Sequence, residues 1–141
     1  MTQTIIDTGP LVAFLNARDS WHGWVLDQWQ TVHPPLLTCE PVITESCFLL
    51  RNIYGGRNAI MQLLARNILR LDFSLSLEYQ AIQQLLERYE SVPMSLADAC
   101  LVRMAELYPN AQILTLDSDF HIYRKHRNQP IPLRIPDSLS L

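Results

Sequence analysis

The sequence predicts an α/β protein of three layers, with a central, mostly parallel sheet between helices. Short apolar runs of strand length alternate along the chain with longer segments of helical periodicity. Two of these runs end in aspartates, Asp7 and Asp117, and open parallel sheets place their ligand sites at that end of the strands. The same observations therefore predict the fold and where its chemistry lies.

The composition is that of a folded domain. The chain has 141 residues, 48% of them apolar and 18% charged, which is enough to bury a core and too apolar for general disorder. We expect a single domain over residues 1–141. No signal-peptide pattern precedes Asp7 and no apolar run has the length of a bilayer span, so a cytoplasmic protein without membrane contact is expected.

The net charge limits how the protein could bind nucleic acid, and the cysteine pattern indicates the state of the thiols. With 11 basic and 14 acidic residues the net charge is −3, so binding to nucleic acid requires a local basic patch or a bound cation. Cys39, Cys47 and Cys100 are odd in number and unclustered, and we expect reduced core residues.

The first predicted strand, residues 4–7, leads into a helix. Gly9 permits a tight turn, and Pro10 suits the first helical position because it lacks an N–H that would have no partner there. Asp7 thus faces a helix N-terminus, where negative charge is favoured. For Asp7 alone, a simple helix cap is the plainer interpretation.

A second helix follows, capped by Asp19 or Ser20. Its tryptophans, at 21, 24 and 29, have helical spacing. Base stacking is one interpretation of them, and packing in the core or in a dimer is the favoured one.

Residues 36–39 form the next predicted strand, and a helix runs from Glu40 to Tyr54, with the pair at 55–56 as its stop. Glu45 borders the apolar stripe of this helix in its second turn, so it can reach over the strand ends. A solvated flank residue is the alternative. A short helix (58–66), a strand (68–73) and an amphipathic helix (77–89) come next and carry no catalytic signal.

The most apolar helix begins near Ser95 and ends near residue 108. Ser95 and Asp98 have the spacing of a capping box, which explains Asp98 structurally without preventing its carboxylate from facing a metal ion. The strand 113–116 then ends in Asp117 and Asp119, for which an Asp-rich turn that caps the next short helix is the alternative.

An aromatic and basic run, 120–127, follows these acids. Its cations are candidates for contacts with RNA phosphates, and His121 and Tyr123 for base stacking, against an ordinary solvated helix face. The candidate cations are Arg124, Lys125 and Arg127. Residues 131–136 are predicted to form an edge strand, because prolines cannot donate within a central ladder.

In a parallel α/β fold the acids at strand ends and in first helical turns can converge at one pole. Close carboxylates raise one another's pKa, so such a cluster calls for protonation or for a hard divalent cation, Mg²⁺ or Mn²⁺. The acids concerned are Asp7, Glu45, Asp98, Asp117 and Asp119.

Four segments, in order, resemble the motifs of PIN-domain ribonucleases, and within them VapC-type toxins of bacterial toxin–antitoxin pairs. They are residues 6–13, Glu45, residues 95–99 and residues 114–120. Each motif alone is weak, but their order along essentially the whole chain makes the resemblance specific. It implies a sheet of order 3-2-1-4-5 and a Mg²⁺- or Mn²⁺-dependent endoribonuclease that hydrolyses phosphodiester bonds in single-stranded RNA.

The resemblance also assigns roles and partners. It implies a catalytic set of Asp7, Glu45, Asp98, Asp117 and Asp119, with all of these except Glu45 as metal ligands. Thr8 and Thr115 match polar positions that hold the carboxylates, and whether Asp117 or Asp119 touches the metal directly stays open. The implied partners are RNA, an antitoxin protein and a second copy of the chain.

Three alternatives remain beside a toxin. They are a PIN nuclease that is not a toxin, a PIN-like RNA- or protein-binding module without cleavage, and a receiver-like phosphotransfer protein. The last is disfavoured because no lysine follows a late strand; Lys125 follows a helix-like run instead. No cysteine or serine arrangement suggests a competing covalent nucleophile.

Overall fold

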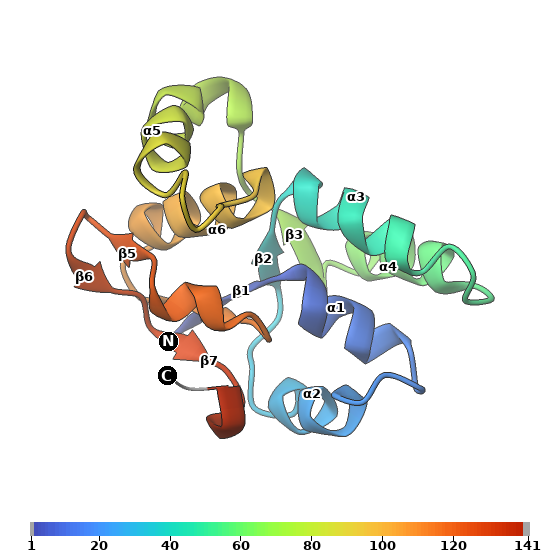
Figure 1. Cartoon of the computed structure of the whole chain (residues 1–141). Helices are drawn as coiled ribbons and strands as arrows, with labels where there is room; N and C mark the ends of the chain where they lie inside the picture. The colour runs from blue at the N-terminus through green and yellow to red at the C-terminus, as the bar shows by residue number, and fades with distance from the viewer. Residues whose placement is uncertain (1, 140–141) are drawn as a thin grey trace.

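The computed structural model describes residues 2–139 and centres on a five-stranded sheet of order β3-β2-β1-β4-β7 (Figure 1). All four strand pairings are parallel. The strands are β1 (Gln3–Ile6), β2 (Leu36–Thr38), β3 (Leu69–Leu71), β4 (Ala111–Leu114) and β7 (Leu133–Arg134). The predicted α/β class and sheet order are confirmed. The fifth strand is labelled β7 because a hairpin of β5 (Arg124–Lys125) and β6 (Gln129–Pro130) precedes it.

Burial on both faces explains the apolar strand sequences. Ile5 of β1 lies opposite Leu37 of β2 and Ile113 of β4, and all three are fully buried. β7 lies at the edge, as its flanking prolines predict. β4 ends at Leu114, two residues before the predicted end, although the N–H of Thr115 still donates to the carbonyl of Arg134.

Helices cover both faces of the sheet. Those of the crossovers from β1 to β2 to β3 are α1 (Thr8–Leu15), α2 (His22–Trp29), α3 (Glu40–Leu49) and α4 (Gly56–Ala65). The crossover from β3 to β4 runs in the opposite direction, so the right-handed rule places α5 (Leu75–Arg88) and α6 (Leu96–Leu107) on the other face. Figure 1 shows α5 and α6 on the opposite side of the strands from α1 and α2.

One predicted helix was too long. The helix expected over residues 40–54 ends at Leu49, where a turn begins, and the glycine pair serves the next helix instead. Gly55 has a left-handed backbone (φ +72°) and directly precedes α4. A Cβ on Gly56 would lie 3.1 Å from Cβ of Leu50, so glycine allows the start of α4 to approach the end of α3.

The tryptophans of α2 pack within the chain. The ring of Trp29 stacks on Phe14 of α1 at 3.7 Å between centroids, and Trp21 meets Trp24 edge to face. All three are half-buried, and the stacking of Trp29 on Phe14 agrees with the packing interpretation. α2 begins at His22, and Asp19 accepts a hydrogen bond from the N–H of Trp21 in the turn before it.

The apolar helix α6 passes through the core as predicted. Cys100 lies on it, fully buried like Cys39 at the start of α3, while Cys47 is partly buried; all three are free thiols. Within residues 2–139 no helix combines the length and the apolar character needed to cross a bilayer.

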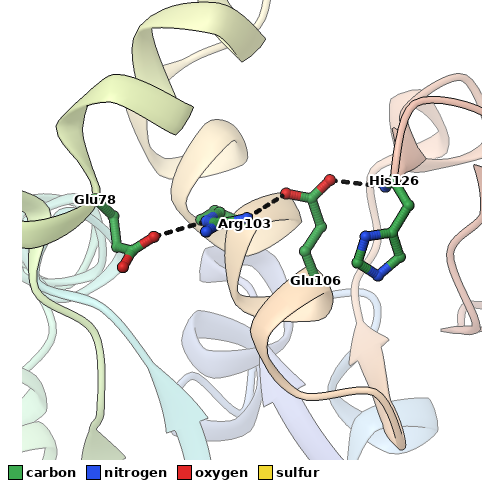
Figure 2. A network of polar contacts seen from close by, with 4 residues as sticks. All are labelled: Glu78, Arg103, Glu106 and His126. Carbon is green, nitrogen blue, oxygen red and sulfur yellow. Dashed lines mark hydrogen bonds and ion pairs between the residues drawn. The ribbon is translucent and has the colours of Figure 1, made fainter.

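A polar network fixes α5 and the β5–β6 hairpin on α6 (Figure 2). Arg103 of α6 donates to Glu78 of α5 at 2.7 Å and to Glu106 at 3.1 Å. The second carboxylate oxygen of Glu106 accepts from the backbone N–H of His126 at 2.7 Å. Partly exposed ion pairs contribute little stability, so the main effect of this network is to set the positions of three elements.

Candidate active site

The candidate site lies where the strand order reverses. β1 continues to β2 on one side, while β4, its neighbour on the other side, is reached by a later crossover. Ligands of open α/β sheets bind in the crevice outside the strand ends at such a switch point. Asp7 directly follows β1, and Asp117 follows β4 after a short loop.

Asp7 is held between these two strand ends. Its Oδ1 accepts from the N–H of Thr8 at 2.7 Å and caps α1, while its Oδ2 accepts from the hydroxyl of Thr115 at 2.8 Å. Burial raises the pKa of Asp7 to about 7, with smaller contributions from the charges of Asp98 and Asp117 and against the lowering effect of both hydrogen bonds. The cap and a role in the site are thus compatible.

Asp98 occupies the first turn of α6. The predicted capping box forms, because the N–H of Asp98 donates to Ser95 Oγ at 3.0 Å and its Oδ2 accepts from the N–H of Ser95 at 3.4 Å. Oδ2 also accepts from the hydroxyl of Tyr123 at 2.9 Å. Burial raises the pKa of Asp98, and the charge of Asp117 adds to this effect.

Asp117 and Asp119 belong to the loop after β4. The side chain of Asp117 caps the short 3₁₀ helix η1 (Ser118–His121) by accepting from the N–H of Asp119 at 2.9 Å, as the turn interpretation expected. The N–H of Asp117 in turn donates to Thr115 Oγ1 at 3.0 Å. Burial and the charge of Asp117 raise the pKa of Asp119.

Glu45 reaches the same place from α3. Most of its side chain is exposed. The pKa of Glu45 is raised mainly because part of the side chain is buried, and secondly by the charge of Asp98.

Gly9 lies in the first turn of α1, where an added Cβ would come within 3.3 Å of Leu116. The missing side chain therefore lets α1 approach the loop that carries the later acids.

These elements enclose one acidic pocket of about 420 Å³. Among the described residues, every ionisable side chain that lines it is a carboxylate. The acids are those expected from the sequence: Asp7, Glu45, Asp98, Asp117 and Asp119. Thr8 also lines it, and its Oγ1 is buried without a hydrogen-bond partner. Within residues 2–139, no three His, Cys, Asp or Glu side chains are grouped closely enough to hold a metal ion together.

The structure does not bring the basic run to this pocket. The guanidinium of Arg124 donates to the carbonyl of His121 at 2.6 Å, and Lys125 is buried in β5. Arg127 lines a separate hollow with Arg88 and Arg103. His126 and Arg127 adopt positive φ, which ends any helix here and forms the hairpin instead. A role for these cations in RNA binding stays a prediction.

The burial of Tyr123 and its contact with the site were not predicted from the sequence. A surface residue available for base stacking was expected, but its ring is fully buried and its hydroxyl contacts Asp98. A fully buried tyrosine needs a hydrogen-bond partner, yet that partner lies 25 residues earlier in the chain and no local pattern indicates it.

Fold and pocket together define an α/β protein with a carboxylate site at the switch point of a parallel sheet. A family model described as "PIN domain" matches residues 4–126. The chain therefore belongs to the PIN-domain family, as the resemblance predicted. Membership supports a nuclease at the level of the family, whose members generally use divalent metal ions.

A solved structure gives the same picture of the fold. The chain is similar to the crystal structure of VapC20 from Mycobacterium tuberculosis, which is described as a sarcin–ricin loop cleaving toxin. The TM-score is 0.71 and the identity 24%, over 91% of this chain and 100% of that one, and at this identity the likeness shows the fold. A comparison with curated proteins finds no match.

Proposed function

We propose that this protein is a Mg²⁺- or Mn²⁺-dependent endoribonuclease that hydrolyses phosphodiester bonds in single-stranded RNA. The observation that carries the proposal is the acidic pocket: carboxylates from α3, α6, the end of β1 and the loop after β4 line one hollow, and the pKa values of Asp7, Glu45, Asp98 and Asp119 are all raised. Burial is the main cause of these shifts and repulsion among the acids adds to it, and a divalent cation would offset both. Family membership supports the same assignment.

The lining of the pocket fits such an ion. Its donors are hard oxygens, which Mg²⁺ and Mn²⁺ prefer, and Mg²⁺ is commonly held by one or two carboxylates together with waters, so a preformed group of three acids is not required. We propose that one or two of Asp7, Asp98, Asp117 and Asp119 would hold the ion directly and the others through waters, with the unpartnered Oγ1 of Thr8 as a further oxygen. When bound, the ion supplies positive charge that acidifies a water and stabilises the leaving oxygen.

The protein's own groups position these carboxylates. The backbone N–H of Thr8 and the hydroxyl of Thr115 each donate to one oxygen of Asp7. The backbone N–H of Ser95 and the hydroxyl of Tyr123 both donate to Asp98 and orient it. Glu45 is exposed at the rim, and its raised pKa suits a carboxylate that accepts a proton from the attacking water.

We further propose that the protein is the toxin of a toxin–antitoxin pair, silenced by an antitoxin segment that covers the acidic pocket, and that it forms a homodimer. The resemblance and the description of VapC20 as a toxin support the assignment as a toxin.

The proposed homodimer has a candidate surface. Exposed apolar side chains at the end of α3, among them Phe48 and Leu49, offer surface for a second copy. Light scattering of the purified chain tests the dimer, and the mass of one chain would contradict it.

The activity is tested on a mixed pool of single-stranded RNA, with single-stranded DNA of the same sequences beside it. An RNA with a sarcin–ricin loop is included because VapC20 is described as cleaving that loop. We expect RNA to be cut with Mg²⁺ or Mn²⁺, chelator to stop the reaction, and DNA to remain intact. Uncut RNA with folded, antitoxin-free protein would contradict the proposal and favour a binding module.

A further inference from the structure

A second hollow, of about 790 Å³, opens beside the acidic pocket. It lies between the start of α3, the segment from β3 into α5, and the start of α6, and it shares Glu45 and Ser95 with the acidic pocket. Figure 1 shows the first turn of α6 next to the first turn of α3. A molecule bound at the acids can therefore extend directly into this hollow.

The wall of the second hollow is mostly apolar. Phe73 supplies an aromatic ring, and Leu75 and Leu96 line it while 40% and 42% exposed. Exposed leucines beside an aromatic ring favour burial of a flat apolar group. The volume lies within the range of roughly 300–1,000 Å³ that is usual for small-molecule sites.

The polar groups of this hollow favour a ligand that donates hydrogen bonds and carries no negative charge. Among the described residues its only ionisable side chains are the carboxylates of Glu40 and Glu45. They disfavour a phosphate or an acidic peptide inside the hollow itself, and they accept hydrogen bonds from amino groups. Ser95 Oγ accepts from the N–H of Asp98, so its own hydroxyl hydrogen can donate to a ligand at the boundary between the two pockets.

We propose that this hollow is a nucleobase subsite, which holds the base of a nucleotide next to the scissile phosphate. The inference rests on the proposed function, because the acids next to it would act on the RNA backbone. Bases with an exocyclic amino group, namely adenine, cytosine and guanine, are favoured over uracil because uracil offers no amino group to the glutamates. An apolar peptide segment is the competing occupant, and it would not require recognition of a base.

The subsite is tested by amide NMR titration with the four ribonucleosides, in chelator. Nucleosides carry a base and a sugar but no phosphate, so their binding is independent of cleavage. We expect shifts of the amides of residues 74–76 and 95–97, larger for adenosine, cytidine and guanosine than for uridine. Leu75→Ala should weaken binding by roughly threefold or more, because it removes apolar contact.

Leu77→Ala is the matched control. Leu77 lies on the same helix, is 80% exposed and does not line the hollow, so its loss should leave nucleoside binding unchanged. Wild-type amides that do not shift, or equal affinity in Leu75→Ala and wild type, would overturn the subsite. In particular, an unresponsive hollow would favour the peptide occupant.

The two proposals fail separately. A chain that cuts RNA but ignores nucleosides refutes the subsite alone, whereas a chain that binds nucleosides but cuts no RNA refutes the nuclease alone. Where RNA is cut, sequencing of the product ends gives a second readout. Leu75→Ala should flatten the base preference at one position beside the cut, and Leu77→Ala should retain it.

Discussion

The hydroxyl of Tyr123 donates to Oδ2 of Asp98 at 2.9 Å in the interior of the protein. The tyrosine ring is fully buried and packs edge to face on Tyr89 and Phe120, so its position is set by the core. The loop after β4 and the start of α6 are thereby linked through the carboxylate itself. Tyr123 therefore acts as a positioning residue for Asp98 in the proposed site.

Tyr123→Phe should lower RNA cleavage by more than its loss of stability explains. The substitution removes a hydrogen bond to a carboxylate, worth about 1.5–3 kcal/mol, and keeps the ring packing. The measurement pairs cleavage rate with the free energy of unfolding. Tyr89→Phe is the control, because the Tyr89 hydroxyl accepts from the N–H of Arg124 and contacts no acid of the pocket. Equal cleavage rates of the two folded variants would contradict the role of Tyr123 in positioning Asp98.

Thr115→Val should disturb two acids at once. The hydroxyl of Thr115 donates to Asp7 and accepts from the N–H of Asp117, so valine leaves both groups short of a partner at a cost of about 1–3 kcal/mol. Thr115→Ser should restore most of the cleavage. Thr38→Val removes a buried hydroxyl that donates to the backbone carbonyl of Ile6 and to no carboxylate, and serves as control. Failure of serine to rescue would argue against the role of the hydroxyl.

Asp7 should make the metal-free protein less stable as the pH rises. Its pKa is raised from 3.8 to about 7 in the folded state, so the folded state binds the proton more tightly than the unfolded state. The resulting stability is fully present below pH 3.8 and is lost as the pH rises to about 7. Asp7→Asn removes this loss. In chelator, the free energy of unfolding of Asp7→Asn should therefore rise relative to that of the wild type by roughly 3 kcal/mol from pH 4 to pH 7. Urea unfolding curves measure the difference, and parallel pH profiles would contradict it.

Mn²⁺ should raise the thermal midpoint of the wild type at neutral pH, because an ion that binds only the folded state stabilises it. The gain should shrink in Asp7→Asn, which loses one charge of the pocket, and persist in Asp27→Asn, which alters an exposed aspartate of α2. Differential scanning calorimetry with and without chelator gives the comparison. An equal gain in all three proteins would place the ion elsewhere.

Local patterns predicted the parts of the site that depend on local structure. The positions of Asp7 at the end of β1 and of Asp117 in the loop after β4, and the capping box of Ser95 and Asp98, follow from short motifs and from the geometry of parallel sheets. The five acids consequently meet in one pocket, although their role in catalysis stays a proposal.

Tertiary packing decided the rest. The burial of Tyr123 depends on Tyr89 and Phe120, which no local pattern connects to it. The glycines at 55–56 suit the end of one helix or the start of the next, and only the close approach to Leu50 settles the choice. Positive φ at Arg127, unusual for arginine, turned the expected helical run into a hairpin.

The most direct test of the acidic pocket is the rate of RNA cleavage by Asp98→Asn, compared with Asp27→Asn at equal folded concentration in Mg²⁺. Asparagine keeps the shape and hydrogen-bonding oxygen of Asp98 and removes its charge, so the cleavage rate should fall by roughly 100-fold or more, the scale on which one charge-stabilising group acts in an active site. Asp27→Asn should cut like the wild type. If Asp98→Asn cuts RNA as fast as Asp27→Asn, the acidic pocket is not the site of cleavage.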